Sequence, residues 1–346
     1  MPLVDCVYDD IFCGSDLRQL ATNPEIAITV NDITISFSLD GAQLFQNKKS
    51  DTWIAIWIIS DYDPKMRYKK KHVLPARVIP GPNKSKNLDS FLFRSFYHLA
   101  ALQHENDGRG MYTWNALQAK VTLSRVFFVL GTADVLGLTE LDGRVGHHGA
   151  QGCQMGCDMK GRHKPLSGHY CAAHLRPNGS DLAENSNHPD YNFSHDPTAP
   201  SPQIYIENLS RVVNSRNQAN YEKNRKLTGI SKPSIIGGLD PRLTLPVPQC
   251  FTVDLMHLLF LNLGELLILL WRGTFWCDPT DDKVTWDWAK LTGQTWTHHG
   301  KLVAGATKYF PSSYHRPPRN PAKKISSGYK ATKYFLYLFG LGPGFF

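Results

Sequence analysis

The sequence predicts an α/β fold in which a mixed β-sheet is flanked by helices. Four short segments in the first part of the chain have the alternating or continuous apolar pattern of strands, and a helical segment lies between the third and the fourth. A strongly apolar helix follows late in the chain. A loop-rich segment with Cys and His residues separates the fourth strand from that helix, so we expect an insertion there.

The predicted strands cover residues 33–45 (ITISFSLDGAQLF), 51–61 (DTWIAIWIISD), 73–80 (VLPARVIP) and 123–134 (LSRVFFVLGTAD). The first alternates apolar and polar side chains, which is typical of a half-buried strand. It is expected to stop at Asp40 and to turn at Gly41, because glycine tolerates a sharp change of direction. The fourth is short, apolar and β-branched or aromatic, and it also ends on an acid, Asp134.

Three further segments are predicted to be helices. Asn87 is expected to cap a helix over residues 88–103, and the polar residues 203–227 are expected to form a second helix. The third begins near Asp254 and contains the longest apolar run, residues 255–271. That run is short for a membrane span and carries a glutamate, so it indicates a buried helix and no membrane partner.

Positive charge is concentrated at the end of the chain. The formal net charge is +8, and residues 301–346 contain eight Lys or Arg but no Asp or Glu. Such a segment favours an anionic partner, with nucleic acid as the first candidate and a solvated basic surface as the equally supported alternative. The residues expected to bind DNA are Lys69, Lys70, Lys71, Arg316, Arg319, Lys323 and Lys324.

The two strand-end acids, Asp40 and Asp134, indicate a metal site if their strands are neighbours. In a sheet of hairpin-linked strands followed by a crossover helix, the first and fourth strands become adjacent. Two ionised carboxylates packed together repel unless a divalent cation lies between them. A pair of Mg²⁺ ions roughly 3.5–4 Å apart would serve phosphodiester chemistry. The alternative is that each aspartate ends its strand because it favours turns.

A third acid is expected near the apolar helix. At 100° per residue, Asp254, His257, Leu261 and Glu265 fall on one stripe of that helix. A polar stripe on an apolar helix suits a helix that packs on a sheet and faces a site. The alternative is that Asp254 is only the N-cap of the helix.

A cluster of Cys and His residues suggests structural zinc. Cys153 and Cys157 form one closely spaced pair, and Cys171 and His174 form another thirteen residues later. Thiolates and imidazole are the ligands of tetrahedral zinc sites, and a loop-rich segment is where a metal would stabilise the fold most. The alternative is a set of unconnected surface residues. The chain has seven cysteines, an odd number, which favours a reducing compartment.

The chain resembles the transposase-like open reading frames of fungal CACTA (En/Spm-type) DNA transposons over residues 32–343. The stretches that carry the resemblance are SLDGAQLFQNKKSDTWIAIWIISD, RYKKKHVLPARVIPGPNKSKNLDSFLF, VGHHGAQGCQMGCDMKGRHKP, FTVDLMHLLFLNLGELLILLWRGTF and RPPRNPAKKISSGYKATKYFLYLFGLGP.

This resemblance implies an RNase H-like catalytic fold with an acidic metal-binding triad that cuts DNA at transposon ends and joins it to a target. Asp40, in LDG, matches the first acid, and Asp134, in GTAD, matches the second. Asp254 is named as the third, with Glu265 as the alternative, because the chain departs from the plant relatives after the DLMH motif. The implied cofactor is Mg²⁺ or Mn²⁺.

The resemblance also bears on zinc, partners and location. Cys153 and Cys157 match the family's cysteine pair, whereas Cys171 and His174 depend on spacing alone. The implied partner is double-stranded DNA, both transposon ends and target. A nuclear location is implied, and a homo-oligomer is compatible with this reading.

The expected organisation has three parts: the first part of the catalytic core at residues 1–142, the Cys/His insertion at 143–202, and the helical remainder of the core with its basic segment at 203–346. Because family members are longer on both sides, we expect this chain to be a fragment. The alternative function is a catalytically inactive, transposon-derived DNA-binding protein or relic.

Overall fold

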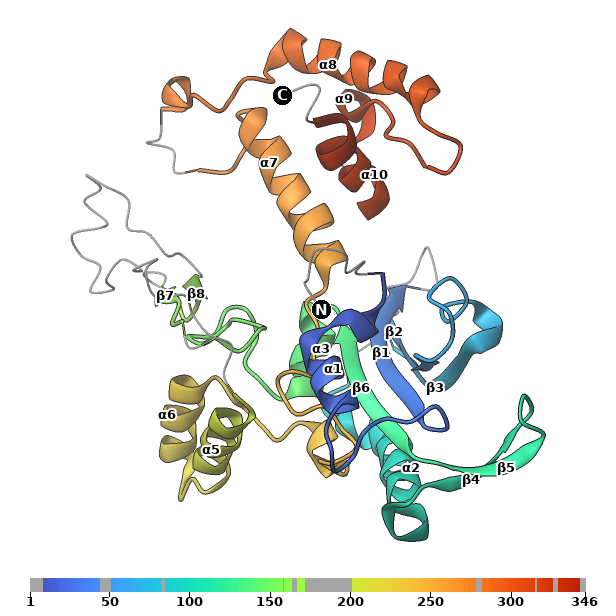
Figure 1. Ribbon diagram of the computed structural model, residues 1–346. Coiled ribbons are helices and arrows are strands. Elements are labelled where there is room, and N and C mark those ends of the chain that lie inside the picture. Colours follow the sequence, from blue (N-terminus) through green and yellow to red (C-terminus); the bar gives the residue numbers. More distant parts are fainter. Residues whose placement is uncertain are drawn as a thin grey trace. The chain divides into compact units, whose positions relative to one another are not determined.

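The computed structural model divides the chain into two compact units, residues 1–253 and 254–346, and each is described by itself (Figure 1). The structure describes residues 9–43, 51–81, 85–157, 159–163, 167–171, 201–277, 282–314, 316–325 and 329–342. Within these ranges, no helix combines the length and the apolar character needed to cross a lipid bilayer.

A four-stranded mixed sheet forms the centre of the first unit, in the order β3-β2-β1-β6 (Figure 1). Its strands are β1 (Ile33–Gln43), β2 (Asp51–Ile59), β3 (Val73–Ile79) and β6 (Val126–Ala133). β2 pairs antiparallel with β1 and with β3, whereas β1 and β6 run parallel. All four predicted strands are therefore confirmed, and the first and the fourth are neighbours as expected.

The predicted turn at Gly41 is wrong. β1 continues to Gln43, and Gly41 pairs with Trp53 of β2. Cross-strand hydrogen bonding therefore extends β1 past Asp40, so the acid is carried on the strand and does not end it.

The segment of residues 243–252 contacts β6 on its other side through two isolated parallel bridges, with a turn at residues 247–250 between them. The backbone N–H of Phe128 donates to the Leu243 carbonyl at 2.9 Å, and the N–H of Gly131 donates to the Cys250 carbonyl at 2.7 Å. A Cβ on Gly131 would lie 2.9 Å from the Phe251 ring, so only glycine allows this close approach. This segment gives the sheet a fifth, irregular neighbour.

Helix α2 (Asp89–Gly108) follows β3 and confirms the helix predicted after Asn87. A hairpin of the strands β4 (Met111–Asn115) and β5 (Lys120–Ser124) then leads the chain to β6. The Asn87 side chain accepts the backbone N–H of Ser90, as a helix cap does. Phe96 of α2 packs edge-on against Phe37 of β1, with ring centroids 5.0 Å apart. Burial of these aromatic side chains fixes the helix on the sheet.

Gln103 connects α2 with β6 and with the segment of residues 240–244. Its side chain is fully buried, and its amide donates to the carbonyls of Val126 and Leu243 at 3.1 and 3.2 Å. Its carbonyl oxygen accepts the N–H of Asp240 at 2.9 Å. One side chain thus satisfies polar backbone groups of α2's two neighbours, β6 and the 240–244 segment.

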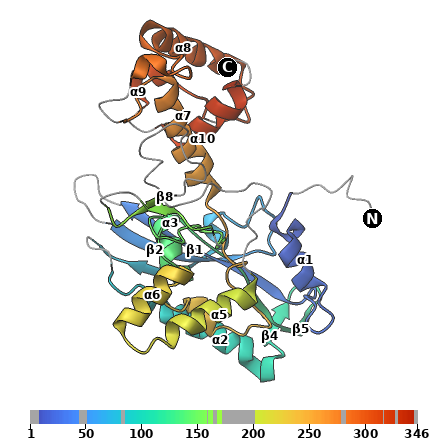
Figure 2. The same cartoon turned by 90° about the vertical axis from the view of Figure 1, so that its left-hand side faces the viewer.

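Several elements surround this core. They are η2 (Ile11–Cys13), α1 (Ser15–Ala21), η3 (Lys70–His72), the hairpin β4 (Met111–Asn115) and β5 (Lys120–Ser124), α3 (Val135–Asp142), β7 (Arg162–His163), β8 (Tyr170–Cys171), α5 (Pro202–Val213), α6 (Gln218–Thr228) and η4 (Ile235–Gly238). The single polar helix predicted at 203–227 is two packed helices, α5 and α6 (Figure 2). Asn217 caps the second, accepting the Asn220 N–H, which explains the break.

The second unit is helical. Its elements are the π-helix η5 (Met256–Asn262), α7 (Leu263–Trp271), η6 (Lys283–Thr285), α8 (Gly293–Gly305), η7 (Ala306–Tyr309), α9 (Pro321–Lys324), α10 (Ala331–Phe335) and the π-helix η8 (Leu336–Leu341). Its core contains Ile268, Trp296, Val303, Tyr334 and Tyr337. The predicted apolar helix is therefore present, but its first half is π-helical. The expectation that it is buried is wrong, because η5 has no buried residue and α7 buries only Gly264 and Ile268.

Candidate functional site

Asp40 and Asp134 lie at adjacent positions on neighbouring parallel strands. The register pairs Leu39 of β1 with Ala133 of β6, and each acid directly follows one of these residues. Neighbouring strands in a sheet lie about 4.8 Å apart, so the backbones of Asp40 and Asp134 are separated by roughly that distance. The prediction that the sheet brings these two positions together is confirmed at the level of the backbone.

The register depends on one extra residue in β6. Ile35 pairs with Phe128 but Ser36 pairs with Leu130, so Val129 is a bulge. Beyond the bulge, Ser38 pairs with Thr132. Two residues further along each strand, Asp40 and Asp134 lie opposite each other. Side chains of paired residues share a face of the sheet, and a shift of one residue moves a side chain to the other face. The bulge therefore places both acids on one face.

The environments of the two acids differ. Asp134 is the N-cap of α3, and its Oδ1 accepts the backbone N–H of Gly137 at 2.7 Å. A Cβ on Gly137 would lie 3.1 Å from that Oδ1, so the glycine leaves room for the acid. Asp40 is exposed on β1. One carboxylate is thus oriented by the start of a helix, while the other faces solvent.

Asp32 and Arg125 fix the opposite end of the same strand pair. Arg125 Nη2 lies 2.6 Å from Asp32 Oδ2, its Nε donates to Asp32 Oδ1 at 3.1 Å, and its backbone N–H donates to the same Oδ1 at 3.0 Å. Burial alone would raise the pKa of Asp32, but hydrogen bonds from Arg125 and Thr29 outweigh it and hold the pKa below its usual value. Sequence analysis did not predict this pair; opposite charges directly before two strands are the signal that could have found it.

The candidates for the third acid, Asp254 and Glu265, belong to the second unit. Asp254 Oδ1 accepts the backbone N–H of His257 at 3.0 Å, and its Oδ2 hydrogen-bonds with the His257 ring. This is the capping geometry of the alternative interpretation. Glu265 is exposed in the first turn of α7. The predicted single stripe is wrong, because η5 is π-helical and a 100° step does not hold there.

The zinc prediction falls partly outside the described residues. Cys153 and Cys157 lie in the described loop before β7, whereas the Cys171 side chain and His174 do not belong to the described part of the chain. In the parts of the chain that are described, no group of three or more His, Cys, Asp or Glu side chains is arranged to hold a metal ion. Zinc binding therefore stays a prediction.

Most of the predicted DNA-binding residues are available at the surface. The exposed ones are Lys69, Lys70, Lys71, Arg316 and Lys323. Arg319 is half-buried, and its guanidinium lies over the Tyr329 ring, 5.9 Å from the centroid, so it also packs against the core of its unit. The side chain of Lys324 lies outside the described residues.

Compared with known proteins, the chain matches no protein-family model, and no curated protein sequence is significantly similar to it.

Proposed function

We propose that the first unit is the core of a DNA transposase that cleaves phosphodiester bonds and transfers strands with the help of Mg²⁺ or Mn²⁺. The observation that carries this proposal is the placement of Asp40, near the end of β1, beside Asp134, which directly follows the parallel strand β6. The strand order, the crossover helix α2 and the parallel 243–252 segment are compatible with an RNase H-like sheet.

The two carboxylates suit the proposed ion. Mg²⁺ prefers carboxylate oxygens and keeps several waters, so two acids on one face are a fitting part of its ligand set. When bound, the metal would activate a nucleophile and stabilise the leaving oxygen. Asp134 would contribute a carboxylate already oriented by the Gly137 N–H, and Asp40 would contribute one open to solvent and to DNA.

A nicking assay tests the catalytic proposal. Wild-type protein should nick supercoiled plasmid DNA with Mg²⁺ or Mn²⁺ but not with Ca²⁺, and Asp40→Asn or Asp134→Asn should abolish nicking while DNA binding remains. Binding of Mn²⁺, measured by calorimetry, should weaken in the same two variants. Asp16→Asn, an exposed acid on α1, is the control. Unchanged Mn²⁺ binding and nicking in both variants would refute the site.

The third acid is assigned by comparison of two variants. We propose Asp254, with Glu265 as the alternative, because both are carboxylates within or directly before the apolar helical run. Asp254→Asn and Glu265→Gln should be assayed together, and the one that loses nicking supplies the ligand. Loss of DNA binding instead of nicking would indicate a structural role. For Asp254, such a role would depend on its hydrogen bonds with His257.

We also propose that the basic second unit binds the phosphate backbone of double-stranded DNA. Truncation at residue 301 is unsuitable as a test, because it would remove Val303 and Tyr337 from the core of that unit. Neutralising the exposed Lys308, Lys323 and Lys330 to Gln should instead reduce the slope of log affinity against log salt, by roughly one for each DNA phosphate that the protein no longer neutralises. An unchanged slope, equal to that of the first-unit control Lys223→Gln, would exclude these lysines from the interface.

A further inference from the structure

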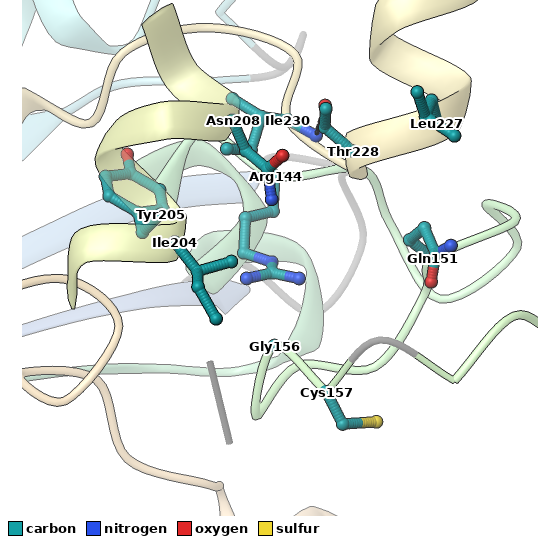
Figure 3. Close-up of a pocket in the computed structure, with 10 residues that line it drawn as sticks. All are labelled: Arg144, Gln151, Gly156, Cys157, Ile204, Tyr205, Asn208, Leu227, Thr228 and Ile230. Atoms are coloured by element: carbon teal, nitrogen blue, oxygen red, sulfur yellow. Dashed lines mark hydrogen bonds between the residues drawn. The ribbon is translucent and has the colours of Figure 1, made fainter. Parts of the chain in front are cut away.

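A small cavity in the first unit contains a buried positive charge. The cavity has a volume of about 80 Å³ and lies between the loop that follows α3 and the helices α5 and α6 (Figure 3). Among the described residues, its polar lining includes Arg144, Gln151, Asn208 and Thr228 but no carboxylate. The described polar side chains around this space are therefore neutral or positive.

Arg144 is the central feature of the cavity. The residue is 7% exposed, and Figure 3 shows its guanidinium directed between Ile204 and Gly156. The Nε is buried and has no hydrogen-bond partner, and no ion pair to the guanidinium is present among the residues described. The nearby Asp142 does not line the cavity, and its Oδ1 accepts the backbone N–H of Arg144 instead, at 2.8 Å.

The neighbouring groups are able to complete an anion site. The Oε1 of Gln151 is also buried without a hydrogen-bond partner, so the amide can turn over and present its NH2 group as a donor. Burial raises the pKa of Tyr205 to about 12, so its phenol stays neutral beside the cavity. Amide and hydroxyl groups donate hydrogen bonds to oxyanions, and a guanidinium fork matches two oxyanion oxygens at once.

We propose that this cavity binds a small tetrahedral oxyanion, phosphate or sulfate, through the guanidinium of Arg144. Asp142 interacts electrostatically with Arg144 but forms no ion pair with its guanidinium, so an anion in the cavity would supply the direct partner that the buried Nε lacks. A volume of about 80 Å³ admits one small ion but not a nucleotide. Since the lining comes from the 144–157 loop and from α5 and α6, the ion would join these two parts of the unit.

The experiment measures phosphate binding to the whole chain. Calorimetry and thermal unfolding should be run with sodium phosphate, sodium sulfate and sodium acetate, each against sodium chloride at equal ionic strength. Phosphate and sulfate should raise the melting temperature saturably. An equal shift with acetate, or no difference between phosphate and the chloride reference, would overturn the proposal.

Variants identify the group responsible. Arg144→Lys keeps the charge but loses the fork, so it should bind phosphate about tenfold more weakly, and Gln151→Met should weaken binding less. Arg144→Met should abolish binding, whereas Arg225→Met, at an exposed ion pair with Glu222, should not change it. Unaltered phosphate affinity in a folded Arg144→Lys protein would refute the assignment.

A competition arm separates the two sources of a phosphate group. Free phosphate should remain bound when duplex DNA is added, because the cavity is small and Arg144 is nearly buried. Displacement by DNA would identify a backbone phosphate as the occupant. The result is independent of DNA cleavage, so failure of the transposase proposal would not affect it.

Discussion

Asp32 and Arg125 join the starting ends of β1 and β6 through a charged pair in which both carboxylate oxygens are engaged. The Arg125 carbonyl also accepts the N–H of Ile33 at 2.9 Å, so backbone and side chain fix the same alignment. Counting from this point, the bulge in β6 determines which residues face each other at the other end. The alignment of Asp40 with Asp134 therefore depends on the Asp32–Arg125 pair at the start of the two strands and on the bulge between that pair and the acids.

Loss of the Asp32–Arg125 pair should destabilise the first unit. The side chains are 3% and 20% exposed, so Arg125→Met leaves a nearly buried carboxylate without its partner and should lower the free energy of unfolding by about 3 kcal/mol. Urea denaturation at pH 7 measures the change. The exposed Arg225→Met, which breaks a surface pair, should change stability by no more than about 0.5 kcal/mol.

The same pair should show a characteristic pH dependence. Because the pKa of Asp32 is lowered in the folded protein, its stabilisation is present above the unfolded value, about 3.9, and is lost as the pH falls through the lower folded value. The difference in stability between wild type and Asp32→Asn should therefore shrink below about pH 4. A difference that stays constant into strong acid would contradict this account.

Asp142 should make stability fall as the pH rises from about 4 to 6. Burial raises the pKa of Asp142 to about 6, so across that window the folded protein binds more protons than the unfolded chain. The loss amounts to roughly 3 kcal/mol if the unfolded pKa is about 3.9. In Asp142→Asn the decrease should disappear, because the amide oxygen still accepts the Arg144 N–H but does not ionise. Denaturation midpoints measured at half-unit pH intervals provide the test.

Two substitutions should separate the structural role of Asp134 from its functional role. Asparagine caps helices about as well as aspartate, so Asp134→Asn should keep the stability of wild type, whereas Asp134→Ala should lose about 1 kcal/mol. Under the proposed function, both variants lose nicking. A folded Asp134→Asn protein with full nicking activity would leave the residue with its capping role alone.

Zinc should be measurable directly. If Cys153, Cys157, Cys171 and His174 hold one ion, mass spectrometry of metals should find close to one zinc per wild-type chain and a clear loss in Cys153→Ser. Cys277→Ser, in the second unit, serves as the control thiol. Equal zinc content in wild type and Cys153→Ser would remove this site.

The sheet was predictable because its signals are local. The alternation in residues 33–39 and the apolar run of β6 each follow from side chains within one strand, and the hairpin order then makes β1 and β6 neighbours. The bulge at Val129 was not predictable, because it depends on which residue of β6 meets which residue of β1. The π-helical turn of η5 was missed for a related reason: the same apolar residues satisfy either helical geometry.

The buried side chains of the first unit show the same limit. Arg144 and Asp142 look like ordinary charged residues in the sequence. Their burial becomes visible only in the folded unit, where α5 and α6 pack beside Arg144. Their spacing matches no metal or catalytic motif. Burial by distant segments is a property of the folded chain, so no pattern along the sequence could indicate it.

The extra residue in β6 determines how this strand responds to a change in its length. Loss of a single codon between those for Arg125 and Asp134 would leave every acid in place in the translated sequence. Loss of Val129 would remove the bulge and leave a regular register, in which Leu39 still pairs with Ala133 and the two acids stay on one face. A second deletion in β6 would have no bulge left to absorb it and would turn one acid to the opposite side of the sheet, so this strand tolerates the loss of one residue but not of two.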